Sequence, residues 1–269
     1  MNRIALQALL LAALSPVGAT FAQTADASAR PTPASIAAPA ETKLADVIPE
    51  ITIDTSTAPE MAGFARIVKA CCETYFGKFA EYLTTDGYQP PTQFTIIFVK
   101  DMGGVANTSG RRPPIIRCAP AYFTANPTDY GALLHEMVHV IQQYRGGAPT
   151  WLTEGITDYV RFYMYEPVAN RPHPNPDTAK YTDSYRVTGC FLDWINRTYD
   201  KAFVQKLNVI CRKGTYTPET WKDITGKDVD TLWSEFAAWL RTQPVPPATA
   251  SQRSRPAVAA KPAGAPKTD

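Results

Sequence analysis

The sequence predicts an α+β fold, with a small sheet followed by a mainly helical part. Short segments rich in β-branched and aromatic residues come first, and helical periodicity dominates afterwards. The region that carries these patterns, residues 49–243, is roughly 195 residues long, which is within the usual range for one domain with a substantial core. We therefore expect one folded domain over this range.

The expected elements follow from the local periodicity of apolar residues and from glycine and proline positions. Strands are expected at 51–53, 94–99 and 114–118. The glycine-rich segment 103–110 is expected to be either a loop or an irregular edge strand. Asp129 is the expected N-cap of a helix that reaches about Tyr144 and stops at Gly146 and Gly147. Helices are expected at 57–83, 130–144, from about 150 onward, 183–199, 201–213, 218–224 and 229–241.

Both ends of the chain are expected to lie outside the domain. Residues 1–22 combine a positive start, a short apolar run and small residues before a cleavage point, which is the pattern of a secretory signal peptide. Residues 23–48 and 244–269 are rich in proline and alanine and lack apolar periodicity, so we expect a disordered leader and a disordered basic tail. The expected location is secreted or periplasmic, after signal-peptide removal.

Charge and hydropathy exclude two classes of partner. The formal net charge is +2, and the tail from residue 244 supplies four of the positive charges against one acid, so the domain itself is nearly neutral. A nucleic-acid-binding domain would carry a basic face. The domain also has no apolar run long enough to span a bilayer. We expect no nucleic acid, no membrane span and a monomer.

The five cysteines suggest little about chemistry. Disulfides are permitted in an exported protein, and the odd number leaves at least one thiol over. Cys190 and Cys211 lie in neighbouring helical segments, so we guess one bridge between them.

The segment His135–His139 is the strongest functional signal. His135 and His139 are four residues apart on an expected helix, so their imidazoles lie on one face, with Glu136 beside them. Two neutral imidazoles and a carboxylate are a ligand set that suits Zn²⁺ and leaves one position for water. The neighbouring carboxylate can take a proton from that water. Only three histidines occur in the chain and two of them are here, which favours one zinc ion over a chance pattern.

The third ligand is expected to be acidic. A histidine six residues after His139 is excluded because Arg145 stands there, and the loop residue His173 stays open as an alternative. Glu154 and Asp158 are four apart on one face of the next helix. We expect Glu154 to bind the metal and Asp158 to orient a histidine, with the reverse assignment also open.

These motifs together resemble the basic secretory protein family, which comprises zincin-like peptidases of plants and bacteria. The resemblance lies in residues 134–142 and 154–161, and it extends to 104–110 and 185–194. It implies a zincin-like metallopeptidase domain in which the active-site helix lies between a small mixed sheet and the helical part. This sequence departs from the family in that its folded part is not basic.

The resemblance also implies a function. It implies a secreted zinc-dependent peptidase that acts on peptides or proteins, with Glu136 as general base and zinc held by His135, His139 and Glu154. Tyr185 matches a family tyrosine and is a candidate oxyanion donor, with Arg161 as a weaker candidate expected in a surface ion pair. The segment 103–110 is the candidate edge that pairs with the peptide. The alternative is a non-catalytic exported binding or defence protein with a structural metal.

Overall fold

The computed structural model describes residues 43–110 and 112–244. The expected signal peptide, most of the leader and nearly all of the tail lie outside the described residues. Within 43–110 and 112–244, no helix is both long enough and apolar enough to cross a membrane.

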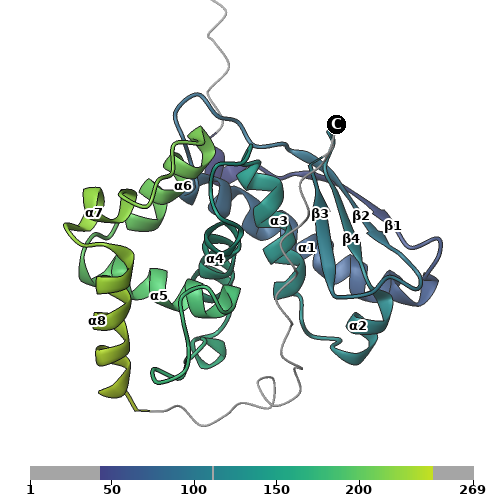
Figure 1. The fold of residues 1–269 in the computed structure, drawn as a ribbon. Coiled ribbons are helices and arrows are strands. Elements are labelled where there is room, and N and C mark those ends of the chain that lie inside the picture. The colour runs from purple at the N-terminus through teal and green to yellow at the C-terminus, as the bar shows by residue number, and fades with distance from the viewer. Residues whose placement is uncertain (1–42, 111, 245–269) are drawn as a thin grey trace, which may run out of the picture. The chain divides into compact units, whose positions relative to one another are not determined.

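A four-stranded mixed sheet forms the first part of the fold (Figure 1). Its strands are β1 (Glu50–Asp54), β2 (Gln93–Phe98), β3 (Ala106–Ser109) and β4 (Ile115–Cys118), in the order β1-β2-β4-β3. Strands β1, β2 and β4 are parallel, and β3 pairs antiparallel with β4. Of the two possibilities for residues 103–110, the edge strand is therefore the correct one.

Helix α1 (Ala62–Tyr82) and the sheet share the first part of the core. A 3₁₀ turn, Pro59–Met61, precedes the helix. The rings of Phe76 on α1 and Phe94 on β2 stack at 6.3 Å, and both are buried. Inward residues alternate along β2, as expected for a half-buried strand. A short helix that the periodicity did not predict, α2 (Pro120–Ala125), follows β4 and begins with proline in its first turn.

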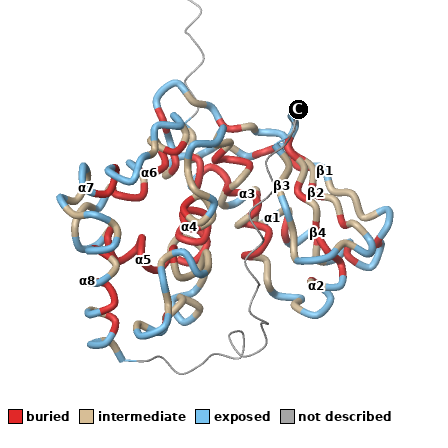
Figure 2. The backbone as a smooth tube through the Cα atoms, in the orientation of Figure 1, coloured by how far each residue is buried: buried red, intermediate tan, exposed pale blue. Residues whose placement is uncertain are grey.

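The remaining helices form the second part, which confirms the α+β class. Helix α3 contacts α1, β3 and β4 on one side and α4 on the other, so it lies between the two parts (Figure 1). Figure 2 shows α3 and α4 as mostly buried segments. The helices are α3 (Gly131–Gln142), α4 (Thr150–Val160), α5 (Tyr185–Thr198), α6 (Phe203–Lys213), α7 (Thr220–Thr225) and α8 (Val229–Arg241). A π-helical turn, Arg161–Tyr165, extends α4.

Helices α4 and α5 approach each other unusually closely, and two glycines make this possible. A Cβ atom on Gly155 would lie 2.2 Å from Cγ2 of Thr188, and one on Gly189 would lie 2.9 Å from the backbone nitrogen of Tyr159. Both distances are shorter than any relaxed contact, so only glycine fits. This close packing fixes the face of α4 that carries Glu154 and Asp158.

Both expected ends of α3 are wrong. The helix ends at Gln142, and its C-cap residue, Gln143, adopts the left-handed conformation with φ 43°, so the chain leaves the helix before Gly146 and Gly147. Asp129 does not cap the helix, and the N-cap position is Tyr130. The Asp129 carboxylate instead accepts hydrogen bonds from the Tyr122 hydroxyl and from Arg161. A buried ion pair has taken the place of a local cap.

The guessed bridge between Cys190 and Cys211 is also wrong, because both thiols are free. Cys190 faces the hydroxyl of Tyr163, and burial raises the pKa of its thiol to about 11. Cys211 is buried on α6, and burial likewise raises its pKa to about 12. Each cysteine therefore packs as a small apolar residue in its own part of the core.

Candidate metal centre

Helix α3 presents its two histidines from a rigid element. Leu133, Leu134, Met137 and Val138 are fully buried, so the helix is held on most of its circumference. The remaining narrow face, which carries the histidines, opens into a large cleft. A site on a helix fixed in this way keeps its geometry without ligand.

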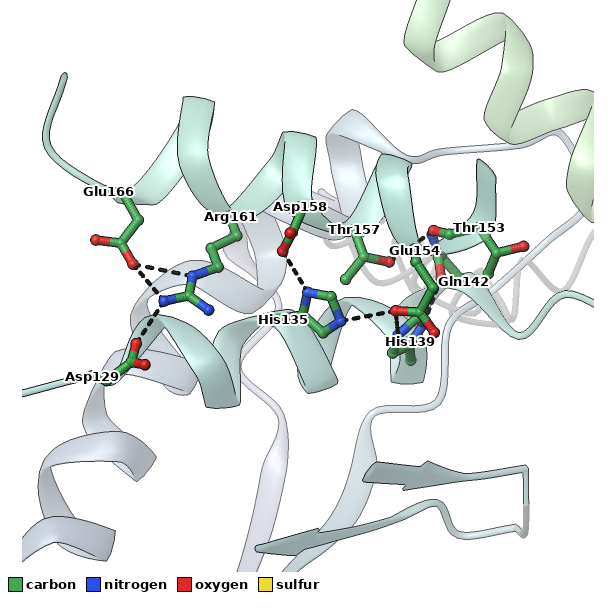
Figure 3. Close-up of polar contacts among 10 residues, drawn as sticks. All are labelled: Asp129, His135, His139, Gln142, Thr153, Glu154, Thr157, Asp158, Arg161 and Glu166. Atoms are coloured by element: carbon green, nitrogen blue, oxygen red, sulfur yellow. Dashed lines mark hydrogen bonds and ion pairs between the residues drawn. The ribbon is translucent and has the colours of Figure 1, made fainter. Parts of the chain in front are cut away.

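Three donor groups converge on one point (Figure 3). Nε2 of His135 and Nε2 of His139 lie 3.1 and 3.2 Å from the same oxygen, Oε2 of Glu154. All three atoms lie within 4.8 Å of one another. Ligands of a tetrahedral zinc ion at about 2.0 Å are separated by about 3.3 Å. The two nitrogen–oxygen distances therefore match the spacing of zinc ligands, and the donor set matches zinc in its chemistry.

The outer nitrogen of each histidine is held by a second group. Nδ1 of His135 donates to Oδ1 of Asp158 at 2.8 Å, and Nδ1 of His139 donates to Oε1 of Gln142 at 2.8 Å. The amide nitrogen of Gln142 donates in turn to the carbonyl of Thr153 at 3.1 Å. In a neutral imidazole such a bond keeps the proton on Nδ1, so that Nε2 can bind a metal.

Charge is concentrated at this point. Burial alone would raise the pKa of Glu154, but hydrogen bonds from His135 and His139 hold it well below its usual range. Burial alone would lower the pKa of His135, but the negative charge and hydrogen bond of Asp158, helped by Glu154, raise it to about 10. The pKa of His139 is also raised, because Glu154 outweighs burial. In the metal-free protein, protons on the two imidazoles therefore supply the positive charge beside Glu154 that a metal ion could supply instead.

Glu136 lies beside this centre and is held by the sheet. Its side chain lines the cleft, although the residue is only 8 % exposed. The hydroxyl of Thr108 on β3 donates to Oε2 of Glu136 at 2.7 Å and lies 2.9 Å from the backbone oxygen of Glu136. The edge strand is thus attached to the residue expected to act as base.

Tyr185, the first residue of α5, lies against the same centre. Its ring stacks on that of His135 with a centroid distance of 6.3 Å, and it lines the cleft. Burial and the negative charges of Glu154 and Asp158 raise the pKa of its hydroxyl. The hydroxyl therefore keeps its proton and can donate a hydrogen bond.

Arg161 is buried, whereas it was expected in an ion pair at the surface. Its guanidinium is buried and bonds Asp129 at 2.5 Å and Glu166 at 3.0 Å (Figure 3). The three residues connect the start of α3 to the extension of α4. A Cβ on Gly131 would lie 2.2 Å from the Glu166 carboxylate and 2.8 Å from Nε of Arg161, so a larger residue there would have to displace this ion pair.

The structure thus brings together all the residues proposed from the two motifs, and His173 is not among those that line the cleft. Gln142 and Thr108 were not predicted as functional residues. Gln142 lies three residues after His139, on the same helical face, and that spacing was the available signal. The role of Thr108 depends on how β3 crosses α3, for which the local sequence has no signal.

The cleft that contains these residues is large. Its volume is about 1600 Å³, whereas small-molecule sites usually occupy about 300–1,000 Å³. One wall is formed by residues 102–110, which include the edge strand β3, and another by residues 182–186, before and at the start of α5. This size and position suit an elongated ligand.

The fold and site define an α+β protein with a candidate metal centre shared by two helices in an open cleft. Residues 50–236 match the family described as peptidase of plants and bacteria, and the chain belongs to that family. The expected peptidase class is confirmed at this level. No curated protein and no solved structure matches the chain.

Proposed function

We propose that the protein is a secreted or periplasmic zinc-dependent peptidase with a zincin-like domain of the basic secretory protein type. The observation that carries the proposal is the meeting of His135, His139 and Glu154 at one point, next to Glu136, within the cleft of a peptidase-family chain. Export rests on the signal-peptide pattern of residues 1–22.

Zinc would be held by Nε2 of both histidines and by the Glu154 carboxylate, with Asp158 and Gln142 orienting the imidazoles. When bound, zinc supplies a Lewis acid for the scissile carbonyl and lowers the pKa of water to about 7.

Glu136 acts as the general base. Its carboxylate takes a proton from the attacking water and then delivers it to the leaving amine. The hydrogen bond from Thr108 holds one oxygen, Oε2, and so leaves Oε1 to exchange the proton. Tyr185, whose raised pKa keeps its hydroxyl protonated, donates to the oxygen on which negative charge develops.

The substrate is an extended peptide that pairs with β3. This strand is at the edge of the sheet, and only one side of it is used by β4. The side that faces the cleft can hydrogen-bond a peptide backbone by β-augmentation. Because Thr108 on β3 donates a hydrogen bond to Glu136, a peptide paired with this edge would lie close to the base.

The test combines metal analysis with activity on a denatured protein for the wild type and Glu136→Gln. We expect one zinc ion in both proteins and hydrolysis by the wild type alone. Chelation should abolish hydrolysis and zinc should restore it. Full zinc-dependent activity in Glu136→Gln would refute the mechanism. Zinc binding without hydrolysis of any peptide in a broad library would instead indicate a binding protein with a structural metal.

A further inference from the structure

The cleft continues beyond the C-terminal end of α3 into a second cavity of about 540 Å³. The two hollows share Arg112, Gln143 and Arg145 as lining residues. Arg112 follows the end of β3, and Arg145 follows the end of α3. A peptide that lies along β3 and extends past Ser109 therefore reaches this cavity.

The second cavity is strongly cationic. Four positive side chains and a single carboxylate, that of Asp86, line it; the positive ones are Arg112, Arg145, Arg212 and Lys213. Within the described residues, neither Arg112 nor Arg145 forms an ion pair, and both are exposed. Their charge is not used by the fold and is available to a ligand.

Arg212 also lines this cavity but has a different role. Its guanidinium lies 4.0 Å from the ring centroid of Tyr88 and donates to the backbone oxygens of Leu83, at 2.7 Å, and Ile141, at 3.2 Å. These carbonyls are at the ends of α1 and α3, so Arg212 ties the two helices together. Burial lowers its pKa, and among the described residues it meets no carboxylate at ion-pair distance. It is part of the scaffold that keeps the positive potential in place.

The centre of the cleft is less positive. Glu136, Glu154 and Asp158 lie within it, and a zinc ion bound there would offset two of these three negative charges. An acidic substrate side chain is therefore favoured where Arg112 and Arg145 lie rather than beside the scissile bond. Clefts with low-dielectric walls strengthen such differences in potential.

We propose that this end of the cleft is a subsite for an acidic residue of the substrate, with Arg112 and Arg145 as the residues that recognise it. The inference rests on the proposed peptidase function. The enzyme should prefer glutamate or aspartate at one outer position of the substrate, on one side of the scissile bond. The two residues that form the scissile bond are not subject to this preference.

The experiment uses the full zinc-loaded protein and pairs of fluorogenic peptides that differ only by glutamate or glutamine at one position. Each position from four before to four after the scissile bond is tested, and kcat/KM is measured for every pair. The variants are Arg112→Gln, Arg145→Gln and the double variant. Arg66→Gln is the matched control, because Arg66 is an exposed arginine on α1 that does not line either hollow.

At one outer position we expect kcat/KM to be about tenfold higher for the glutamate peptide than for the glutamine peptide. Each of the two arginines would contribute a factor of a few, as is usual for an exposed ion pair. The preference should fall to about one in the double variant, remain in Arg66→Gln and weaken at high salt. Equal rates for every pair, or an unchanged preference in the double variant, would overturn the subsite and leave the peptidase proposal intact. If no peptide is cleaved, the peptidase proposal fails instead. Binding of the same pairs, measured by fluorescence anisotropy, then decides whether the acidic subsite exists.

Discussion

Nδ1 of His139 on α3 donates to Oε1 of Gln142, and through this amide the histidine is tied to the backbone of Thr153 on α4. Thr153 directly precedes Glu154, the expected third ligand. The orientation of one expected ligand and the position of another thus depend on the same side chain, that of Gln142, which is only 1 % exposed.

Gln142→Ala should weaken zinc binding by about 10- to 100-fold, because loss of an outer hydrogen bond to a ligand typically has this effect. Competition with a chromogenic chelator measures the affinity. Gln93→Ala is the control, since Gln93 is exposed and, within residues 43–110 and 112–244, its side chain hydrogen-bonds only Glu50. An unchanged affinity in Gln142→Ala would show that His139 does not need this support.

Glu154→Ala and Asp158→Ala should differ in zinc retention. If Glu154 is the ligand, its loss leaves two imidazoles and should remove zinc on dialysis. Asp158→Ala removes only the bond to Nδ1 of His135, so the affinity should fall about 10- to 100-fold with zinc still bound at excess metal. If Asp158→Ala lost zinc and Glu154→Ala retained it, Asp158 would be the ligand and Glu154 the residue that orients a histidine.

Zinc binding should release protons at pH 7.5. The pKa of His135 is raised to about 10 in the metal-free protein, so this imidazole is protonated there and must lose its proton to bind a metal. Apparent zinc affinity should therefore rise with pH towards about 10 and fall as the pH is lowered. Calorimetry in buffers with different ionisation enthalpies measures the released protons. The variant Asp158→Asn should release fewer protons on zinc binding. A binding enthalpy that does not depend on the buffer would contradict the prediction.

The sequence predicted the parts of the site that depend on spacing along one helix. Because four residues make about one helical turn, His135 with His139 and Glu154 with Asp158 were predictable as pairs on one face. The convergence of the two pairs depends on the packing of α3 against α4. The sequence suggested it through the carboxylate pair that follows the histidines and through the family resemblance.

What the sequence did not predict depends on contacts between distant segments. Asp129 matched the local pattern of an N-cap, but the buried guanidinium of Arg161, 32 residues later, takes its carboxylate. Removing a partner from a buried ion pair costs about 3–5 kcal/mol, whereas a cap contributes about 1 kcal/mol. The bond between Thr108 and Glu136 similarly joins residues that are 28 positions apart.

Thr108→Val should lower kcat while zinc affinity stays the same. The substitution keeps the shape but removes the hydroxyl that holds Oε2 of Glu136. A hydrogen bond to a charged group contributes about 1.5–3 kcal/mol, so we expect a decrease of about 10- to 100-fold. Thr108→Ser, which retains the hydroxyl, should recover most of the activity. Equal kcat values for the valine and serine variants would show that the bond does not position the base.

Gly189→Ala should lower both stability and zinc affinity, because its Cβ would lie 2.9 Å from the backbone nitrogen of Tyr159 and 3.1 Å from the carbonyl carbon of Asp158. Backbone atoms cannot rotate away, so α4 must shift and carry Asp158 with it. Overpacking of this kind costs about 1–3 kcal/mol, which urea unfolding measures. Gly63→Ala is the matched control, since that glycine lies on α1 with nothing within 4 Å of its Cβ position. There the higher helix propensity of alanine should leave stability unchanged or raise it by up to about 1 kcal/mol. If both variants behaved alike, the close approach of α4 and α5 would not be what fixes the metal centre.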